Sequence, residues 1–302
     1  MRSNDSMPAP SEPCPVCGGR CVRRRQVLRA GLVGVCGHCG CWYRQPRPGA
    51  EELAGLYGDR YYDSWGLSEN PAAAERGKML TFTRLLAQID PLLPASPTGP
   101  RRLLDVGAAT GLLLTAAQQR GWRPYGVEIN PYAAELLCRC FGADRIYQGE
   151  LPQSPFPLAF FDAITMTDVI EHVLDIRRTL HAAAVRLRPG GILALTTPRV
   201  DSLSRRLLGA HWLHFKLEHI QYFTRAALAE SLQTAGFQVI TLTGWSKSLD
   251  WEYLHRQLQT YPHWLLSPLV SGLRALLPRS LRQRPLWYRC GEMLALARRN
   301  PT

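Results

Sequence analysis

A strand-like run that enters a glycine-containing turn constrains the fold of this 302-residue chain more than any other segment. Residues 103–111 read Leu-Leu-Asp-Val-Gly-Ala-Ala-Thr-Gly, which predicts a buried strand, a turn and the start of a helix. Glycine lets a ligand approach the turn closely, and the N-terminus of the helix offers free N–H donors. The next predicted strand ends at Glu128, where an acid can accept both hydroxyls of a ribose. Together the two segments indicate a nucleotide-type cofactor.

Strand-like and helix-like segments alternate from residue 103 to residue 298. This alternation predicts an α/β fold with a parallel sheet that is covered by helices on both faces. The predicted strands are Leu103–Val106, Pro124–Glu128, Arg145–Tyr147, Phe161–Met166, Gly191–Thr197, Phe237–Thr243 and Met293–Ala297. Apolar residues at helical spacing predict one more helix over residues 71–90, and four prolines between 91 and 100 predict a linker.

Four segments, LLDVGAATG, GVEIN, FDAITMTDVIEHV and LRPGGILALTTP, together resemble class I S-adenosylmethionine (SAM)-dependent methyltransferases. The resemblance is closest to the ubiquinone-biosynthesis-type branch with its D-x-x-E-H segment, and it covers about 200 residues in the family's order. It implies a Rossmann-like sheet, SAM as cofactor and methyltransferase activity. Ala109 departs from the pattern, because the family usually has a glycine there. Alanine is small, so the departure affects the loop geometry rather than cofactor binding.

The resemblance also implies roles for individual residues. The first loop would shape the pocket for the methionine part of SAM, Glu128 would bind the ribose diol and Ile129 would pack on the adenine. The implied SAM-binding residues are Asp105, Gly107, Gly111, Glu128, Ile129, Glu150, Leu151 and Asp168. Structural alternatives exist for two of them. Asp105 could satisfy loop amides, and Asp168 could cap a helix in which Glu171 completes a capping box.

Methyl transfer from SAM requires an aligned acceptor and, for some acceptors, the removal of a proton. The sequence after the fourth predicted strand lacks the Asn/Asp-Pro-Pro-aromatic signature of enzymes that methylate exocyclic amines of bases. An oxygen or carbon of a small molecule (a carbohydrate, a polyketide or a lipid-linked acceptor) is therefore favoured. We predict His172 and His219 as catalytic residues. Tyr61 and Tyr62, in a segment that resembles the family's N-terminal lid, are an alternative source of the base.

Two Cys-x-x-Cys pairs lie near the N-terminus, with 18 residues between them. The predicted metal ligands are Cys14, Cys17, Cys36 and Cys39. Two knuckles at this spacing predict a zinc ribbon, and four thiolates leave no open position, so the Zn²⁺ would be structural. A redox dithiol is the main alternative. Cys21, His38 and Cys41 are further candidate ligands.

Lysine and arginine outnumber aspartate and glutamate by 36 to 24, and only three of the basic residues are lysines. The net charge of +12 reflects either a composition bias or an anionic partner. An anionic partner would fit an RNA methyltransferase that grips phosphate with the zinc ribbon and arginines. A SAM-fold binding module without catalysis is a separate alternative. The chain has no long apolar run and no signal-like start, from which we expect a cytoplasmic location.

Three units are predicted along the chain. They are a zinc ribbon (1–45), a helical lid and linker (46–100) and a SAM-binding domain (101–302) with a helical insertion at 248–286. The insertion combines leucines and tryptophans with several arginines. Its helices either cover the substrate pocket or meet lipid as a peripheral membrane contact.

Overall fold

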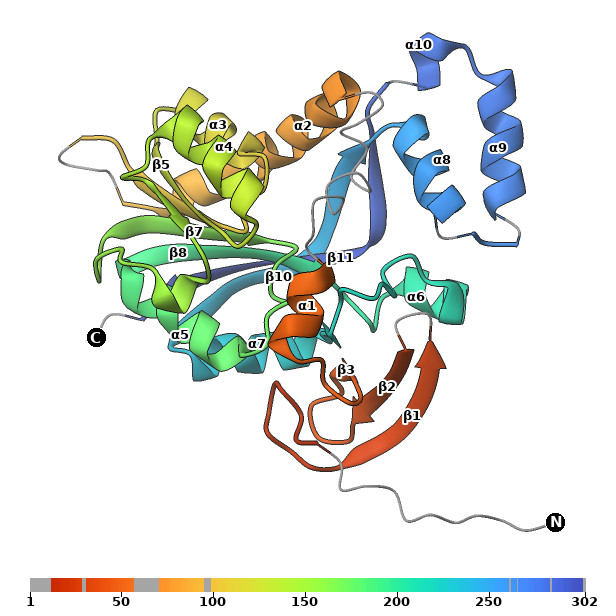
Figure 1. Ribbon diagram of the computed structural model, residues 1–302, viewed down its shortest axis with the longest axis horizontal. Coiled ribbons are helices and arrows are strands. Elements are labelled where there is room, and N and C mark those ends of the chain that lie inside the picture. The colour runs from red at the N-terminus through yellow and green to blue at the C-terminus, as the bar shows by residue number, and fades with distance from the viewer. Residues whose placement is uncertain are drawn as a thin grey trace.

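Two sheets organise the described part of the chain in the computed structural model, one of seven strands and one of four (Figure 1). The structure describes residues 12–28, 31–56, 71–94, 99–260, 262–264, 266–282 and 284–300. The predicted lid residues Tyr61 and Tyr62 lie outside the described residues.

The seven-stranded sheet confirms the predicted α/β fold. Its strands are β4 (Arg102–Val106), β5 (Arg123–Glu128), β6 (Ile146–Gln148), β7 (Phe161–Thr167), β8 (Leu187–Pro198), β10 (Phe237–Leu249) and β11 (Leu286–Arg299). Their order is β10-β11-β8-β7-β4-β5-β6. The prediction of an all-parallel sheet is wrong for β11, which pairs antiparallel with both β8 and β10. The reason is that β11 pairs with its immediate predecessor β10 without a crossover, and such a pair must run antiparallel.

Helices cover both faces of this sheet, as predicted (Figure 1). On one face lie α2 (Pro71–Ile89), α3 (Leu112–Gln119) and α4 (Pro131–Phe141), and on the other lie α5 (Ile176–Arg186) and α7 (Arg225–Thr234). The helix predicted over 71–90 is α2, and it buries Leu85, Leu86 and Ile89 against the sheet because these residues recur at helical spacing. Each face thus has its own apolar core.

The N-terminal sheet has the strand order β1-β2-β3-β9. Its strands are β1 (Val22–Leu28), β2 (Gly31–Cys36), β3 (Trp42–Arg44) and β9 (Gln221–Tyr222). The last of these comes from the larger unit, since Trp42 pairs with Tyr222 and Tyr43 with Gln221. The two units therefore share a sheet, and α1 (Ala50–Leu56) follows it.

Strands β10 and β11 continue as a pair to Leu249 and Leu286, where the last register pair lies. The chain between them forms α8 (Trp251–Thr260), α9 (Leu266–Leu276) and α10 (Arg279–Arg282). We call α8, α9 and α10 the arm. It stands apart from the body at the upper right of Figure 1. The remaining short elements are η2 (Asp90–Leu92), η3 (Leu151–Gln153), α6 (Leu203–Leu208) and η4 (Gly209–His211).

Candidate functional site

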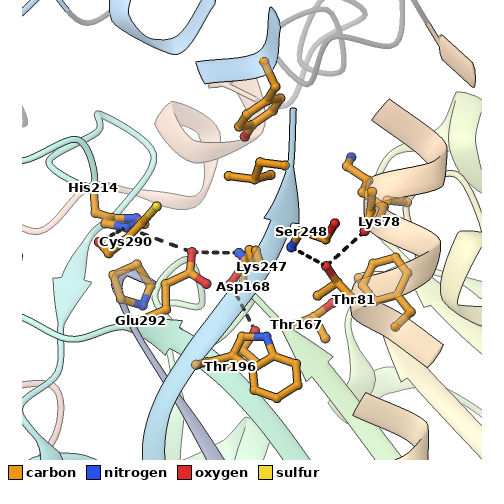
Figure 2. Close-up of a pocket in the computed structure, with 18 of the residues that line it drawn as sticks. Lys78, Thr81, Thr167, Asp168, Thr196, His214, Lys247, Ser248, Cys290 and Glu292 are labelled. Atoms are coloured by element: carbon orange, nitrogen blue, oxygen red, sulfur yellow. Dashed lines mark hydrogen bonds and ion pairs between the residues drawn. The ribbon is translucent and has the colours of Figure 1, made fainter. Parts of the chain in front are cut away.

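A pocket lies where β4, β7 and β8 end, between α2 and the base of the arm (Figure 2). Ligand sites of open α/β sheets form at the carboxyl ends of the strands, because the loops diverge there. Five of the predicted site residues line this pocket, namely Asp105, Gly107, Asp168, His172 and His219.

The backbone conformation and the packing of the loop after β4 require glycine at position 107. Gly107 has φ +73°, and a Cβ there would lie 2.6 Å from Cγ2 of Val169. Ala109 stands where the family usually has glycine, and its φ of +49° lies in the left-handed region. Asp105 is buried and accepts a hydrogen bond from Oγ1 of Thr165 at 2.7 Å. Burial raises the pKa of Asp105 to about 8, helped by the charge of Glu128 and opposed by the Thr165 bond.

Glu128 lies at the end of β5 and links the loop after β4 to the residues that follow β5. Its buried carboxylate accepts one hydrogen bond from the N–H of Ala109 at 2.8 Å and another from the N–H of Asn130 at 2.9 Å. Ile129, the predicted adenine contact, is 45% exposed. The other predicted residues do not line the pocket. Gly111 begins α3, while exposed Glu150 and buried Leu151 follow β6.

Asp168 takes part in an ion-pair network that joins the end of β7 to strands β10 and β11 (Figure 2). Lys247 of β10 donates to Asp168, and it donates to Glu292 of β11 at 2.7 Å. Burial opposes the charge of Lys247, but the two carboxylates outweigh it and raise its pKa. Burial also works against the charge of Asp168, but Lys247 lowers its pKa, so the Lys247–Asp168 pair is ionised.

The alternative in which Asp168 and Glu171 form a capping box is wrong. No helix starts there, because α5 begins at Ile176 with Asp175 as its cap. Glu171 is instead fully buried and accepts a hydrogen bond from Oγ1 of Thr197 at 2.9 Å. Burial raises its pKa well above the usual range, and the charge of Asp168 adds to this shift.

His172 and His219 lie edge to face, with ring centroids 4.7 Å apart. Nδ1 of His219 lies 2.8 Å from the His214 carbonyl, and Nδ1 of His172 lies 2.9 Å from the Glu218 carbonyl. A carbonyl only accepts, so Nδ1 carries the proton in both rings. Burial lowers both pKa values, to about 4 for His172 and well below the usual range for His219. The ring of His219 is therefore neutral and carries an acceptor lone pair on Nε2.

The sequence reasoning missed the basic residues of the pocket. All three lysines of the chain, Lys78, Lys216 and Lys247, line it. Burial lowers the pKa of Lys78 to about 7, with the charge of Lys247 as a further cause. The sequence did contain a signal for them, because lysine is scarce in this arginine-rich chain and all three lysines line the pocket.

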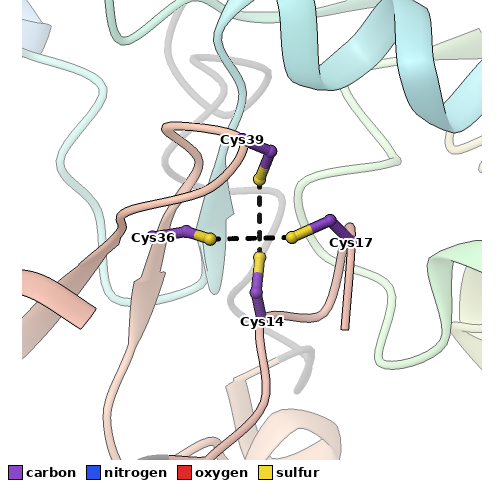
Figure 3. A group of neighbouring side chains, drawn as sticks. All are labelled: Cys14, Cys17, Cys36 and Cys39. Carbon is purple, nitrogen blue, oxygen red and sulfur yellow. Dashed lines mark hydrogen bonds between the residues drawn. The ribbon is translucent and has the colours of Figure 1, made fainter. Parts of the chain in front are cut away.

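The four predicted cysteines converge in the N-terminal unit (Figure 3). The Sγ atoms of Cys14 and Cys39 lie 3.7 Å apart, and those of Cys17 and Cys36 lie 3.6 Å apart. Tetrahedral zinc with Zn–S bonds of about 2.3 Å has S···S edges of about 3.8 Å, so the cluster fits this ion. Cys21 and His38 are exposed, and Cys41 donates to the Tyr222 carbonyl.

Comparison with known proteins finds relatives of the larger unit. A family model described as a methyltransferase domain matches residues 78–242. Ubiquinone biosynthesis O-methyltransferases from Azoarcus sp. and Alkalilimnicola ehrlichii are 27% and 32% identical over 48% and 37% of this chain. A demethylmenaquinone methyltransferase from Tropheryma whipplei is 34% identical over 32% of it. The matched segments span 67%, 49% and 42% of these relatives, respectively.

Solved structures share the fold at low sequence identity. The [4+2]-cyclase SpnF is 19% identical, with a TM-score of 0.55 over 85% of this chain and 99% of its own. The 1,6-didemethyltoxoflavin-N1-methyltransferase of Burkholderia thailandensis, bound to S-adenosylhomocysteine, is 16% identical, with a TM-score of 0.50 over 92% of this chain and 96% of its own. A cyclase and a methyltransferase thus share the fold, and the reaction must be argued from the site.

Proposed function

Because the chain belongs to the methyltransferase domain family of class I SAM-dependent enzymes, we propose that it transfers a methyl group from SAM to an oxygen or carbon of a small-molecule acceptor. The observation that carries the proposal is a single pocket lined by both the loop after β4 and two neutral histidines. The O-methyltransferase relatives favour oxygen as the methylated atom.

The residues around the loop fit SAM. Gly107 lines the pocket and leaves room for Val169, which a Cβ would contact, and Asp105 offers a buried carboxyl in the same lining. Glu128 lies at the end of β5, and a carboxylate at this position can accept a hydrogen bond from a ribose hydroxyl. Ile129 is exposed and can pack on the adenine. SAM supplies the methyl group and its own leaving group when bound. Gly111, Glu150, Leu151 and Asp168 complete the proposed cofactor-binding set.

His219 is the proposed general base. Its Nε2 lone pair is the group that can accept a hydroxyl proton, while the His214 carbonyl fixes the ring orientation through Nδ1. His172 packs against this ring and is the second candidate. A neutral imidazole can accept a proton from an uncharged hydroxyl, and burial keeps the pKa of His219 low enough for the ring to stay neutral.

Glu128→Ala is expected to weaken SAM binding by roughly 10- to 100-fold, because hydrogen bonds to a charged group contribute about 1.5–3 kcal/mol. Calorimetric titration with SAM measures the change. Glu135→Ala, which removes an exposed carboxylate of α4, is the control and should bind SAM like the wild type. Unchanged affinity in Glu128→Ala would refute the ribose assignment.

The reaction itself is tested by release of S-adenosylhomocysteine. We expect release with at least one class of hydroxylated acceptor among phenols, sugars and polyketides. Methylation of RNA alone, together with RNA binding that falls steeply with salt, would favour the RNA-directed alternative. SAM binding without transfer to any acceptor or RNA would favour a binding module.

We also propose that residues 1–45 form a structural zinc unit, that 46–100 contribute to a lid and linker, and that 101–302 hold the cofactor. Strand β3 pairs with β9, which begins two residues after His219. The N–H of Arg44 donates to the Ile220 carbonyl at 3.0 Å. The proposed zinc unit therefore supports the loop that carries the proposed base.

A further inference from the structure

Helix α9 of the arm presents an apolar face to the outside. Leu269, Leu273 and Leu276 are 52%, 39% and 83% exposed, and their spacing places them on one side of the helix. Among the described residues of α9, only Val270 is buried. A surface helix of a water-soluble body normally turns its apolar stripe inward, whereas no described part of this chain covers the outward stripe of α9.

Further exposed apolar residues flank α9 along the chain. Trp264 precedes the helix and is 77% exposed. Leu281, Leu286 and Trp287 follow it and are exposed as well. Large exposed apolar side chains are thus concentrated in residues 264–287. Figure 1 shows α9 and α10 at the outer end of the arm, away from the sheet.

The same segment is basic. Residues 264–287 contain four arginines and no aspartate or glutamate. Arg274 and Arg282 pair with Glu252 of α8 and so hold the three arm helices together. Arg279 and Arg284 are exposed, and so is Arg289 just beyond the segment. The outer surface of the arm is therefore both apolar and positively charged.

We propose that the arm, through α9, α10 and Trp264, docks onto the surface of an anionic lipid bilayer. An outward leucine stripe with arginines and interfacial tryptophans is the pattern that binds in the headgroup region, where apolar burial and attraction to anionic lipid add together. Among the described residues, no helix is long and apolar enough to cross a membrane, so the contact is peripheral. A second copy of the chain fits less well, because two arms face to face would bring like charges together.

Docking of the arm gives the pocket a defined orientation relative to the bilayer. Tyr253, Leu254 and Gln257 of α8 line the pocket, while Glu252 of the same helix holds α9 and α10. The arm thus joins the wall of the pocket to the surface that contacts lipid. This inference goes beyond the proposed function and does not depend on it, because vesicle binding requires no acceptor.

Flotation of the full chain with vesicles tests the proposal. We expect binding to phosphatidylglycerol-containing vesicles, weaker binding to pure phosphatidylcholine, and a decrease with added salt. The double variant Leu273→Gln/Leu276→Gln should bind anionic vesicles at least 10-fold less tightly, since it removes apolar contact from exposed positions. Arg279→Ser/Arg284→Ser should lose about fivefold per arginine.

The matched control is Val27→Gln/Leu158→Gln, which makes the same kind of change at exposed positions outside the arm and should bind vesicles like the wild type. SAM affinity should be unchanged in every variant, which separates this test from that of the proposed function. Failure of the wild type to bind anionic vesicles, or equal binding by the leucine variant, overturns the proposal. Concentration-dependent dimerisation that the leucine variant abolishes would overturn it in favour of self-association.

Discussion

Substitution of His219 by alanine is expected to lower turnover by about 10²- to 10⁴-fold and to leave SAM affinity unchanged. General-base assistance is typically worth this factor, and the variant removes the Nε2 lone pair that would take the acceptor proton. His219 is buried at 5% exposure, so alanine also leaves a cavity. His219→Gln addresses this point, because glutamine can still donate to the His214 carbonyl but cannot act as a base. Both variants should be slow.

The pH profile provides a second readout. The neutral ring is the base, and burial lowers the pKa of His219, so acid removes the base only well below the usual range. An ordinary histidine with a pKa of about 6.5 would lose roughly three quarters of its base form at pH 6. We therefore expect wild-type turnover to stay level between pH 7.5 and 6.

His211→Ala is the matched control for this series. His211 belongs to the same segment but is exposed, so its loss should leave turnover near the wild-type value. Near-normal rates for both His219→Ala and His172→Ala would refute the assignment. The base would then have to be one of the lid tyrosines or solvent.

Cys36→Ser is expected to abolish zinc binding, which should be close to one ion per chain in the wild type. Structural zinc contributes an apparent 10–16 kcal/mol in small zinc-binding units, so the N-terminal sheet should unfold when the ion is lost. Turnover should fall as well, because β3 would no longer support β9 beside His219. SAM affinity should change little, since the loop after β4 belongs to the other unit.

Metal analysis, circular dichroism and turnover measure these effects. Cys21→Ser is the control, because Cys21 is exposed and lies outside the four-thiol cluster, so this variant should keep its zinc. Zinc retained in Cys36→Ser would show that the ligand set is wrong. Normal turnover in a zinc-free protein would refute the proposed support of the His219 loop.

Much of the fold was predictable because its signals are local. The strand, turn and helix after residue 103 are contiguous, and each Cys-x-x-Cys pair needs only one tight turn. The same reasoning correctly predicted the direction of six of the seven strands, because strands linked through helices run parallel. It failed for β11, because the choice between crossing over and returning beside β10 depends on contacts that no local pattern contains.

The network of Lys247 shows what only the tertiary structure decided. Its partner Asp168 lies 79 residues away along the chain and its partner Glu292 lies 45 residues away. Neither spacing forms a motif, since the three residues meet only when β10 and β11 complete the sheet beside β7 and β8.

The same distinction applies to the histidines and to the arm. Sequence alone identified His172 and His219 as candidates, but their protonation follows from burial and from carbonyls of the loop that carries His214 and Glu218. Sequence alone also identified an apolar and basic insertion with two alternative roles. Only the folded chain decided that its α8 side faces the pocket while the leucines of α9 face outward, because the direction of a side chain depends on what its helix packs against.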